Sequence, residues 1–407
     1  MMRRFIFTAI TVILVERNQK DVKHMNKYHC YCQDFKMARN KMNRFLLSIL
    51  LCLFTMSISA AEKMSVYGVV YDVGLNFGGK NLSVENFRPE QVAYDMSIIK
   101  HVLNCNTVRI EGEDLNRLSI ATREARKQGL KVLFNPWKME SDSATTVDYM
   151  RRASQVAEEL RKEGTDMIFV TGCEYTLFNR GVFPGDTFEE RMTWLYEIGA
   201  KPNPFEIIQE KSKILNQILH SMSSQVRQHF HGRIVYSSGA WESVDWDNFD
   251  YIGVDYYHNN ESDEQYVEGF GRYTSMGKPV IVMEMGSCAY QGAAERGGNG
   301  FSIFKGVDSE GKGIYEGGKA PVRDESVQAD YISKNIGLLE KAGASGVMVY
   351  VFSYPIYPYS ESGIDYDMVS YALVKSFPST DARSKQIPSW EPKKAFYRVG
   401  EIFSKFH

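Results

Sequence analysis

Two glutamates stand at the ends of two apolar, strand-like runs and could act together in acid/base chemistry. Glu174 closes the run 167–174, and Glu284 closes the run 280–284. A charged side chain at the end of a buried strand is costly unless it is paired or used. In a (β/α)8 barrel the carboxyl ends of the strands bring together side chains from distant parts of the chain. Two carboxylates that face each other there can serve as nucleophile and proton donor on a glycosidic bond.

The elements that must position these glutamates follow an α/β pattern, in which short β-rich runs alternate with helical stretches. The predicted strands are residues 65–71, 106–110, 131–135, 167–171, 234–237, 251–255, 280–283 and 347–352. The predicted helices are residues 89–103, 117–128, 146–163, 204–229, 263–276, 327–342 and 393–405. Several strands are continuously apolar, as strands covered on both faces are. The pattern therefore predicts a single-domain (β/α)8 TIM barrel over residues 62–407. An open doubly wound sheet is disfavoured because no glycine-rich nucleotide fingerprint follows the first strand.

Two connections are longer than a barrel needs. Residues 175–203 follow the fourth strand, and the glycine-rich residues 286–324 follow the seventh. Connections of this length in a compact domain are usually functional or disordered. We expect both to lie over the face that carries the two glutamates.

The charge distribution separates the start of the chain from the rest. The net charge is −2, but residues 1–60 hold ten Lys or Arg against three Asp or Glu, which leaves −9 for the remainder. A mildly acidic body disfavours a nucleic-acid partner and suits a neutral partner such as a carbohydrate. We expect a monomer.

The N-terminal region resembles export machinery. Asn43 and Arg44 precede an apolar run over residues 45–56, which is too short to span a bilayer well. Small residues follow, so a signal peptide over residues 42–61 with cleavage after Ala61 fits, and cleavage before Ala60 is a near alternative. Residues 1–41 then form an upstream extension, unless residues 5–15 belong to a longer targeting segment. The prediction is a protein exported to the periplasm or the extracellular space, without an integral membrane domain.

The cysteines and histidines of the mature chain do not form a metal-binding pattern. Cys105, Cys173 and Cys288 are widely spaced, and pairing of Cys173 with Cys288 is left open. His229 and His231 have no third ligand beside them in the sequence. We expect no required metal and no cofactor.

Further candidates for substrate binding follow the other strands. Asn135 and Trp137 end the third strand, and Trp241 follows the fifth; for the tryptophans, stacking on sugar and buried packing are equally plausible. Glu242 is expected at the rim of the site rather than in the reaction. Glu111, with the nearby Glu113 and Asp114, is expected in a solvated loop or helix cap.

Several of these segments resemble clan-A glycoside hydrolases, which are TIM-barrel enzymes. Lys278, Pro279, an apolar strand, Glu284 and Gly286 are similar to that clan's seventh strand, which carries the nucleophile. Glu174 matches the position of its acid/base, and Arg109 resembles its second-strand arginine near the nucleophile. The segment 251–257, with Asp255, Tyr256 and Tyr257, resembles its sixth strand, where a tyrosine or histidine contacts the nucleophile.

The resemblance implies a retaining mechanism with Glu284 as nucleophile and Glu174 as acid/base. Arg109 would lower the pKa of Glu284, and Tyr256 would donate a hydrogen bond to it. A drier setting would raise the pKa of Glu174, and the two carboxyl groups would lie about 5 Å apart. His258 and Tyr354 are further candidates for substrate contact.

One position departs from the clan's pattern. The residue before the acid/base is usually an asparagine that holds the sugar 2-hydroxyl, and here it is Cys173. A thiol is a weak donor and acceptor. The substrate class is therefore open, and a non-catalytic glycan-binding barrel is the alternative to a hydrolase.

The segments 109–115, 134–138 and 172–178 also resemble bacterial proteins named abortive phage infection proteins, which would imply a defence role.

Overall fold

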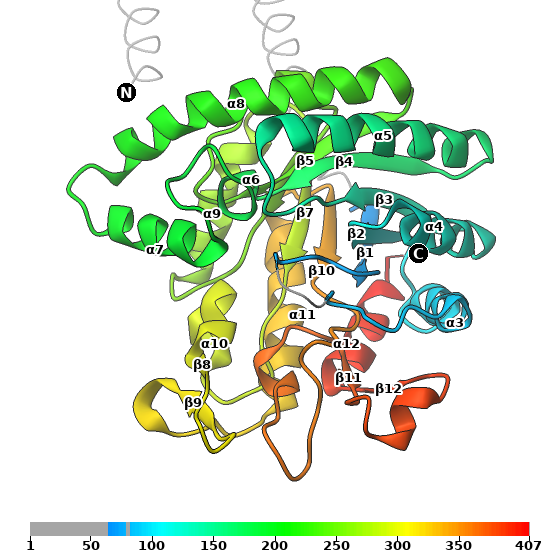
Figure 1. The fold of residues 1–407 in the computed structure, drawn as a ribbon, viewed down its shortest axis with the longest axis vertical. Coiled ribbons are helices and arrows are strands. Elements are labelled where there is room, and N and C mark those ends of the chain that lie inside the picture. Colours follow the sequence, from blue (N-terminus) through cyan, green and yellow to red (C-terminus); the bar gives the residue numbers. More distant parts are fainter. Residues whose placement is uncertain (1–63, 79–81, 407) are drawn as a thin grey trace, which may run out of the picture. The chain divides into compact units, whose positions relative to one another are not determined.

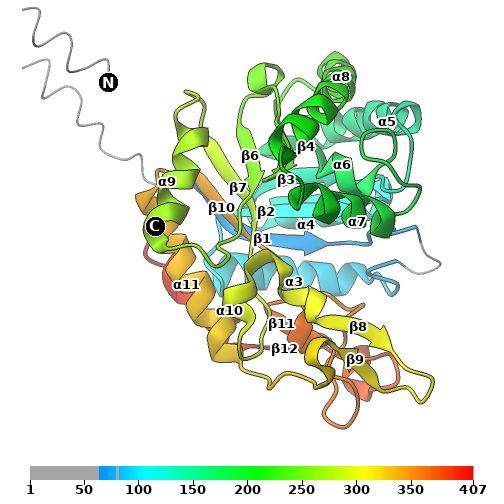
Figure 2. The same ribbon diagram turned by 90° about the vertical axis from the view of Figure 1, so that its left-hand side faces the viewer.

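Eight parallel strands form a closed barrel in the computed structural model, which describes residues 64–78 and 82–406. The order around the barrel is β1-β10-β7-β6-β5-β4-β3-β2 (Figures 1 and 2). The strands are β1 (Val66–Asp72), β2 (Thr107–Gly112), β3 (Lys131–Pro136), β4 (Met167–Cys173), β5 (Arg233–Gly239), β6 (Ile252–Asp255), β7 (Val280–Met285) and β10 (Gly346–Val349). The closed order confirms the predicted TIM barrel and excludes the open sheet. The expected extension (1–41) and signal peptide (42–61) lie outside the described residues.

The principal helices form a layer around the strands (Figures 1 and 2). They are α3 (Pro89–His101), α4 (Leu115–Lys127), α5 (Ser143–Lys162), α8 (Pro204–His229), α9 (Asp263–Thr274), α11 (Glu325–Lys341) and α12 (Lys394–Phe403). Local signals set their bounds. Asp114 caps α4 by accepting from the backbone N–H groups of Asn116 and Arg117, and Pro89 occupies the first turn of α3. In the part of the chain that the structure describes, no helix is long and apolar enough to cross a membrane.

The long connections contain structure of their own. After β4 the chain forms α6 (Tyr175–Phe178) and α7 (Phe188–Gly199) before α8. After β7 it forms α10 (Ala293–Arg296), η2 (Gly297–Ile303), the antiparallel hairpin of β8 (Phe304–Val307) and β9 (Gly313–Tyr315), and η3 (Glu316–Gly318). The segment after β10 holds η4 (Asp367–Val369) and the pair β11 (Val374–Ser376) and β12 (Trp390–Pro392), with η5 (Ala382–Lys385) between them. Between β5 and β6 lies η1 (Trp246–Asn248).

The barrel interior changes from apolar to polar toward the carboxyl ends of the strands. Its apolar part is a cluster of buried residues that includes Val70, Leu133, Val170, Val235, Ile281 and Met348. Because alternate residues of a strand face the same side, the residues two positions beyond Val70 and Leu133 face inward as well. These are Asp72 and Asn135, and both lie in register with Glu111 on β2. A polar layer therefore closes this end of the barrel.

Candidate active site

Arg109 joins β2 to the end of β7 from inside the barrel. Its Nη1 atom donates to the Glu284 Oε1 atom at 3.0 Å and to the Met283 carbonyl at 3.0 Å. Its Nη2 atom lies 3.4 Å from the Glu111 Oε2 atom, and the Arg109 side chain is fully buried. The predicted proximity of Arg109 and Glu284 is thus present in the structure. A fully buried guanidinium fixes the direction in which the Glu284 carboxylate can point.

Cys173 lies between two carboxylates. Its Sγ atom is 3.5 Å from the Asp255 Oδ2 atom and 3.5 Å from the Glu284 Oε1 atom, so its one proton can serve either. Asp255 also accepts a hydrogen bond from the Ser237 hydroxyl at 2.8 Å. Burial, followed by Asp255 and Glu284, raises the pKa of the Cys173 thiol well above its usual range. Cys173 is therefore a neutral thiol that can donate to Glu284. Cys173 and Cys288 are both free and buried, so the pairing left open above does not occur.

The tyrosine that bonds the candidate nucleophile is Tyr257 and not Tyr256. The Tyr257 hydroxyl donates to the Glu284 Oε2 atom at 3.3 Å. The Tyr256 hydroxyl donates instead to the Tyr266 carbonyl at 2.9 Å, and its ring packs on Tyr266 with 4.7 Å between centroids. The expectation for Tyr256 was wrong because the alternation of faces along β6 continues past its last residue, Asp255, and turns Tyr256 away from Glu284. Since Asp255 faces inward, Tyr257 does so too, and this alternation was the signal that could have found it.

Glu174 lies at the turn from β4 into α6. Its backbone has φ 41° and ψ 49°, in the left-handed region that non-glycine residues rarely adopt. Its N–H donates to the Ser237 carbonyl at 2.9 Å, which ties the turn to β5. The residue is partly exposed, whereas Glu284 is buried. Glu174 is thus the more accessible of the two glutamates, as a group that must reach a leaving group should be.

The electrostatics of the two glutamates agree in part with the sequence-based expectation. Burial, with Asp255, Glu284 and Glu242 as nearby negative charges, raises the pKa of Glu174 well above its usual range, as expected. The expectation of a lowered pKa for Glu284 was wrong. Burial raises the pKa of Glu284 and outweighs the opposing contributions of Arg109, Cys173 and Tyr257. All three donors nevertheless favour the charged form of Glu284.

Two other members of the polar layer are fully buried, and only for Glu111 did the sequence indicate otherwise. Glu111 is fully buried inside the barrel rather than solvated, and burial raises its pKa well above the usual range. Asn135 is fully buried, and the described part of the chain offers neither its Oδ1 nor its Nδ2 atom a hydrogen-bond partner. Asp114 does cap a helix, and Glu113 forms an ion pair with Lys138. The acidic segment 111–114 at the end of β2 therefore divides between the barrel interior and the surface.

The candidate aromatic residues occupy different environments. Trp137 is buried and packs edge-on against Phe178 with 4.9 Å between centroids, while its Nε1 atom has no hydrogen-bond partner among the described residues. Trp241 is half-buried, and its Nε1 atom donates to the Thr176 hydroxyl at 3.0 Å. Tyr354 is half-buried and stacks on Tyr357 with 5.4 Å between centroids. Burial, then the negative charges of Asp72, Glu111 and Glu284 among others, raises the pKa of Tyr354, which places it near the polar layer.

His258 is held by the scaffold. Its Nδ1 atom is 2.9 Å from the Asn335 Oδ1 atom, and its Nε2 atom is 3.0 Å from the Glu261 carbonyl. The ring packs on Tyr266 and is buried. Both ring nitrogens are therefore occupied by partners on α11 and in the loop before α9, which gives His258 a structural role in place of the expected substrate contact.

Glu242 is not at the rim of the site. It is buried beneath α6 and accepts hydrogen bonds from Thr176, Tyr236 and Gly239.

The sequence analysis did not identify Ser237 and Asp72, which lie beside the site on β5 and β1. Their polar character within apolar strands was the available signal for both. No local signal identifies the partners of Glu242, because they come from the turn after β4.

One group of side chains is close enough to share a cation. Single ligand atoms of Cys173, Asp255 and Glu284 lie within 4.8 Å of one another, and all three residues are buried. Thiolate and carboxylate donors together would suit a borderline metal such as zinc. The Arg109 guanidinium already contacts the same Glu284 oxygen and competes with a cation for it. The expectation of no required metal stays a prediction.

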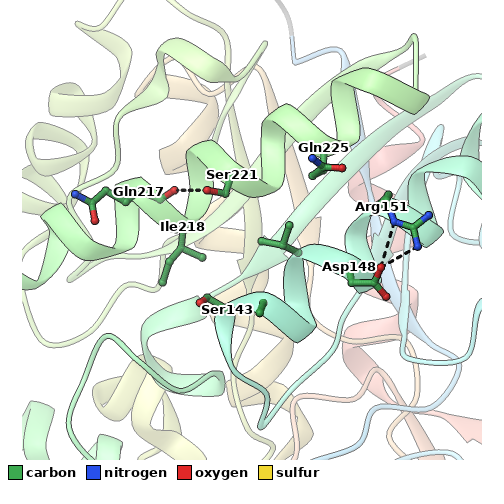
Figure 3. A pocket seen from close by; sticks show the side chains of 9 residues that line it. Ser143, Asp148, Arg151, Gln217, Ile218, Ser221 and Gln225 are labelled. Atoms are coloured by element: carbon green, nitrogen blue, oxygen red, sulfur yellow. Dashed lines mark hydrogen bonds and ion pairs between the residues drawn. The ribbon is translucent and has the colours of Figure 1, made fainter.

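A surface pocket lies away from these residues, in the helix layer between α5 and α8. Figure 3 shows Asp148 and Arg151 forming an ion pair on one side, with Gln217, Ser221 and Gln225 opposite. None of the residues that line this pocket lies at a strand end. The candidate active site is instead the group of carboxylates at the carboxyl ends of β4, β6 and β7, with Arg109 and Cys173 bonded to those of β6 and β7.

No family model matches this sequence, and no curated protein matches it. Solved structures do. The GH113 β-mannanase AaManA from Alicyclobacillus acidocaldarius matches with a TM-score of 0.51 and 14% sequence identity, over 86% of this chain and 100% of that one. A family 1 β-glucosidase from Thermotoga maritima matches with a TM-score of 0.50 and 10% identity, over 84% of this chain and 97% of that one.

At these identities the comparison concerns the fold. None of the solved structures named here supports the resemblance to abortive phage infection proteins. Matches to glycoside hydrolases across most of both chains, together with the closed eight-stranded barrel, confirm the resemblance to clan-A glycoside hydrolases at the level of the fold.

Proposed function

We propose that this protein is a retaining glycosidase that cleaves O-glycosidic bonds of a carbohydrate, with Glu284 as nucleophile and Glu174 as acid/base. The observation that carries the proposal is the set of three donors around Glu284, namely Arg109, Cys173 and Tyr257. Donors on both carboxylate oxygens fix the group in one orientation and favour its charged form. A nucleophile needs both properties.

The two chemical steps divide between the glutamates. In the first, the Glu284 carboxylate attacks the anomeric carbon, the bond to the leaving oxygen breaks, and Glu174 gives that oxygen its proton. In the second, Glu174 takes a proton from water, which attacks the anomeric carbon and releases Glu284. The raised pKa of Glu174 keeps it protonated for the first step. Its partial exposure lets leaving group and water reach it.

The test is a panel of aryl β-glycosides and β-linked oligosaccharides, mannosides and glucosides among them, with wild type, Glu284→Ala and Glu174→Ala. We expect turnover by wild type and a loss of about 10³-fold or more in Glu284→Ala. Proton NMR of the first product should show the anomer with retained configuration. Unchanged turnover in Glu284→Ala would sink the assignment, and an inverted first product would remove the retaining mechanism.

A non-catalytic glycan-binding barrel is the second candidate, and Cys173 favours it. A thiol in place of a carboxamide cannot hold a sugar hydroxyl as firmly. Saturable glycan binding without hydrolysis, unaffected by Glu174→Gln, would support this function instead.

We also propose that the protein is exported and acts as a monomer on its carbohydrate substrate. The apolar run 45–56, followed by small residues up to Ala61, supports export. Fractionation of cells that produce the full chain, combined with N-terminal sequencing of the mature protein, tests both location and cleavage site. Cytoplasmic protein that still carries residues 42–61 would contradict the proposal.

A further inference from the structure

The turn that carries Glu174 is held by a hydrogen-bond network that the catalytic proposal does not use. Glu174 is one of three non-glycine residues in the described part of the chain with a positive φ. Such a conformation persists only where the surroundings hold it. The residues that follow, Tyr175 and Thr176, begin α6, and their backbone N–H groups have no partner within that helix.

Tyr236 and Glu242 supply those partners from the end of β5. The Tyr175 N–H donates to the Tyr236 hydroxyl at 2.8 Å, and that hydroxyl donates to the Glu242 Oε2 atom at 2.8 Å. The Thr176 N–H donates to the Glu242 Oε1 atom at 3.1 Å, and the Thr176 hydroxyl donates to the same oxygen at 2.7 Å. The first two residues after Glu174 are thus both anchored, directly or through one hydroxyl, to Glu242.

The contacts of Glu242 fit a carboxylate and no other side chain. Each of its two oxygens accepts two hydrogen bonds, because the Gly239 N–H adds a bond to Oε2 at 3.2 Å. All four groups around it are donors. An amide in its place would turn an NH₂ group toward two of those donors. The Trp241 indole extends the network by donating to the Thr176 hydroxyl at 3.0 Å.

Glu242 also acts on Glu174 through its charge. It is one of the negative groups that raise the pKa of Glu174, after Asp255 and Glu284. Burial raises the pKa of Glu242 itself to about 7, against the lowering effect of its hydrogen bonds from Thr176, Tyr236 and Gly239. The hydrogen bonds of Glu242 hold the turn that carries Glu174, and its negative charge helps to keep Glu174 protonated. Both effects favour Glu174 as a proton donor.

We propose that Glu242 is a positioning residue for Glu174, which it acts on by anchoring the first turn of α6 and by placing a negative charge beside the acid/base. The inference rests on the function proposed above. It extends that function to a buried residue whose two oxygens accept hydrogen bonds from Thr176, Tyr236 and Gly239.

Leaving-group dependence tests this, because protonation matters little for a leaving group that departs as a stable anion. In Glu242→Gln we expect kcat/KM for the phenyl glycoside to fall roughly 10- to 100-fold, and kcat/KM for the dinitrophenyl glycoside of the same sugar to change by less than about threefold. Removal of a negative charge lowers the pKa of Glu174, so the alkaline limb of kcat/KM should move to lower pH. The sugar is the one cleaved fastest by wild type in the panel above.

Glu158→Gln is the matched control. Glu158 is another buried glutamate that accepts from arginine and backbone donors, but it lies on α5 and outside the site. The Glu158→Gln variant should have a lower thermal stability than wild type. The ratio of kcat/KM between the phenyl and dinitrophenyl glycosides should not change. Equal losses on both substrates in Glu242→Gln, with an unmoved alkaline limb, would overturn the inference. Wild type inactive on every glycoside would instead overturn the proposed function.

If Glu242→Gln does not fold, Tyr236→Phe provides a second variant that tests the same inference. It removes the hydroxyl between Tyr175 and Glu242 and should shift the substrate ratio in the same direction. Amide hydrogen exchange adds a measurement that requires no activity. The N–H groups of Tyr175 and Thr176 should exchange faster in Glu242→Gln than in Glu158→Gln, and equal exchange would contradict the anchoring role.

Discussion

Arg109 and Glu284 form an ion pair inside the barrel, with 3.0 Å between the Nη1 and Oε1 atoms and with the guanidinium fully buried. The same guanidinium lies 3.4 Å from Glu111. One cation therefore opposes, for two carboxyl groups at once, the rise in pKa that burial causes. Removing either partner of such a pair is costly because the other charge is left uncompensated.

Arg109→Lys should shift the acidic limb of kcat/KM to higher pH. A lysine ammonium cannot reach Glu284, Glu111 and the Met283 carbonyl at once, so Glu284 loses part of the attraction that opposes burial. We expect kcat/KM below neutral pH to fall about tenfold. The measurement is a pH profile of kcat/KM beside a thermal melt.

Arg323→Lys is the control for Arg109→Lys. Arg323 bonds Asp365 and Asp367, which lie after β10, so these ion pairs involve none of the candidate site residues. It should lower the melting temperature and leave the pH profile in place. An acidic limb that stays fixed in Arg109→Lys would show that Arg109 does not control ionisation of Glu284.

The neighbours Tyr256 and Tyr257 offer a matched pair of hydroxyl deletions. Tyr257→Phe removes the donor to the Glu284 Oε2 atom and should lower kcat/KM about tenfold, with little effect on stability. Tyr256→Phe removes a bond to the Tyr266 carbonyl and should cost about 1 kcal/mol of unfolding free energy with activity retained. Steady-state kinetics and denaturant unfolding of both variants check this. The reverse pattern would restore Tyr256 as the partner of the nucleophile.

The sequence predicted the barrel and the placement of both glutamates because these follow from hydrophobic runs. Apolar strands covered on both faces, separated by amphipathic helices, leave few architectures open. Glu174 and Glu284 interrupt this pattern at strand ends and were visible for that reason. The period of two along a strand would also have distinguished Tyr257 from Tyr256.

The rest depended on contacts between distant segments. Burial of Glu111 follows from closure of the barrel, which turns the end of β2 inward, and its sequence neighbours Glu113 and Asp114 remain outside. The role of Glu242 follows from how the turn after β4 meets the end of β5. The pKa of Glu284 is raised because burial outweighs three hydrogen-bond or charge donors that lower it. Donors can be proposed from a sequence, but the extent of burial cannot be read from it.

Cys173→Asn should strengthen recognition of a sugar 2-hydroxyl. A carboxamide supplies a firm donor and acceptor where the thiol supplies weak ones. We expect the ratio of kcat/KM between a glycoside and its 2-deoxy analogue to rise about tenfold over wild type. Cys173→Ser is the control, since its hydroxyl can still donate toward Asp255 or Glu284 but reaches no farther than the thiol. An equal ratio in both variants would place the 2-hydroxyl elsewhere in the site.

Asp95 should make the unfolding free energy depend on pH between about 4 and 7. It is buried and accepts hydrogen bonds from Tyr71, Gln91 and Trp390. Burial nevertheless raises its pKa to about 7. A carboxyl group with a raised folded-state pKa contributes its full stability below the unfolded-state pKa and loses it as pH rises through the folded-state value.

The loss that Asp95 causes on going to pH 7 should amount to roughly 3–4 kcal/mol at most, at 1.36 kcal/mol for each pKa unit. Urea unfolding followed by tryptophan fluorescence across this range measures it. Asp95→Asn cannot ionise, so its curve should be flatter than that of wild type, and the difference between the two isolates Asp95 from other titrating groups. Parallel curves would mean that Asp95 is charged in the folded protein at neutral pH, with its three donors outweighing its burial.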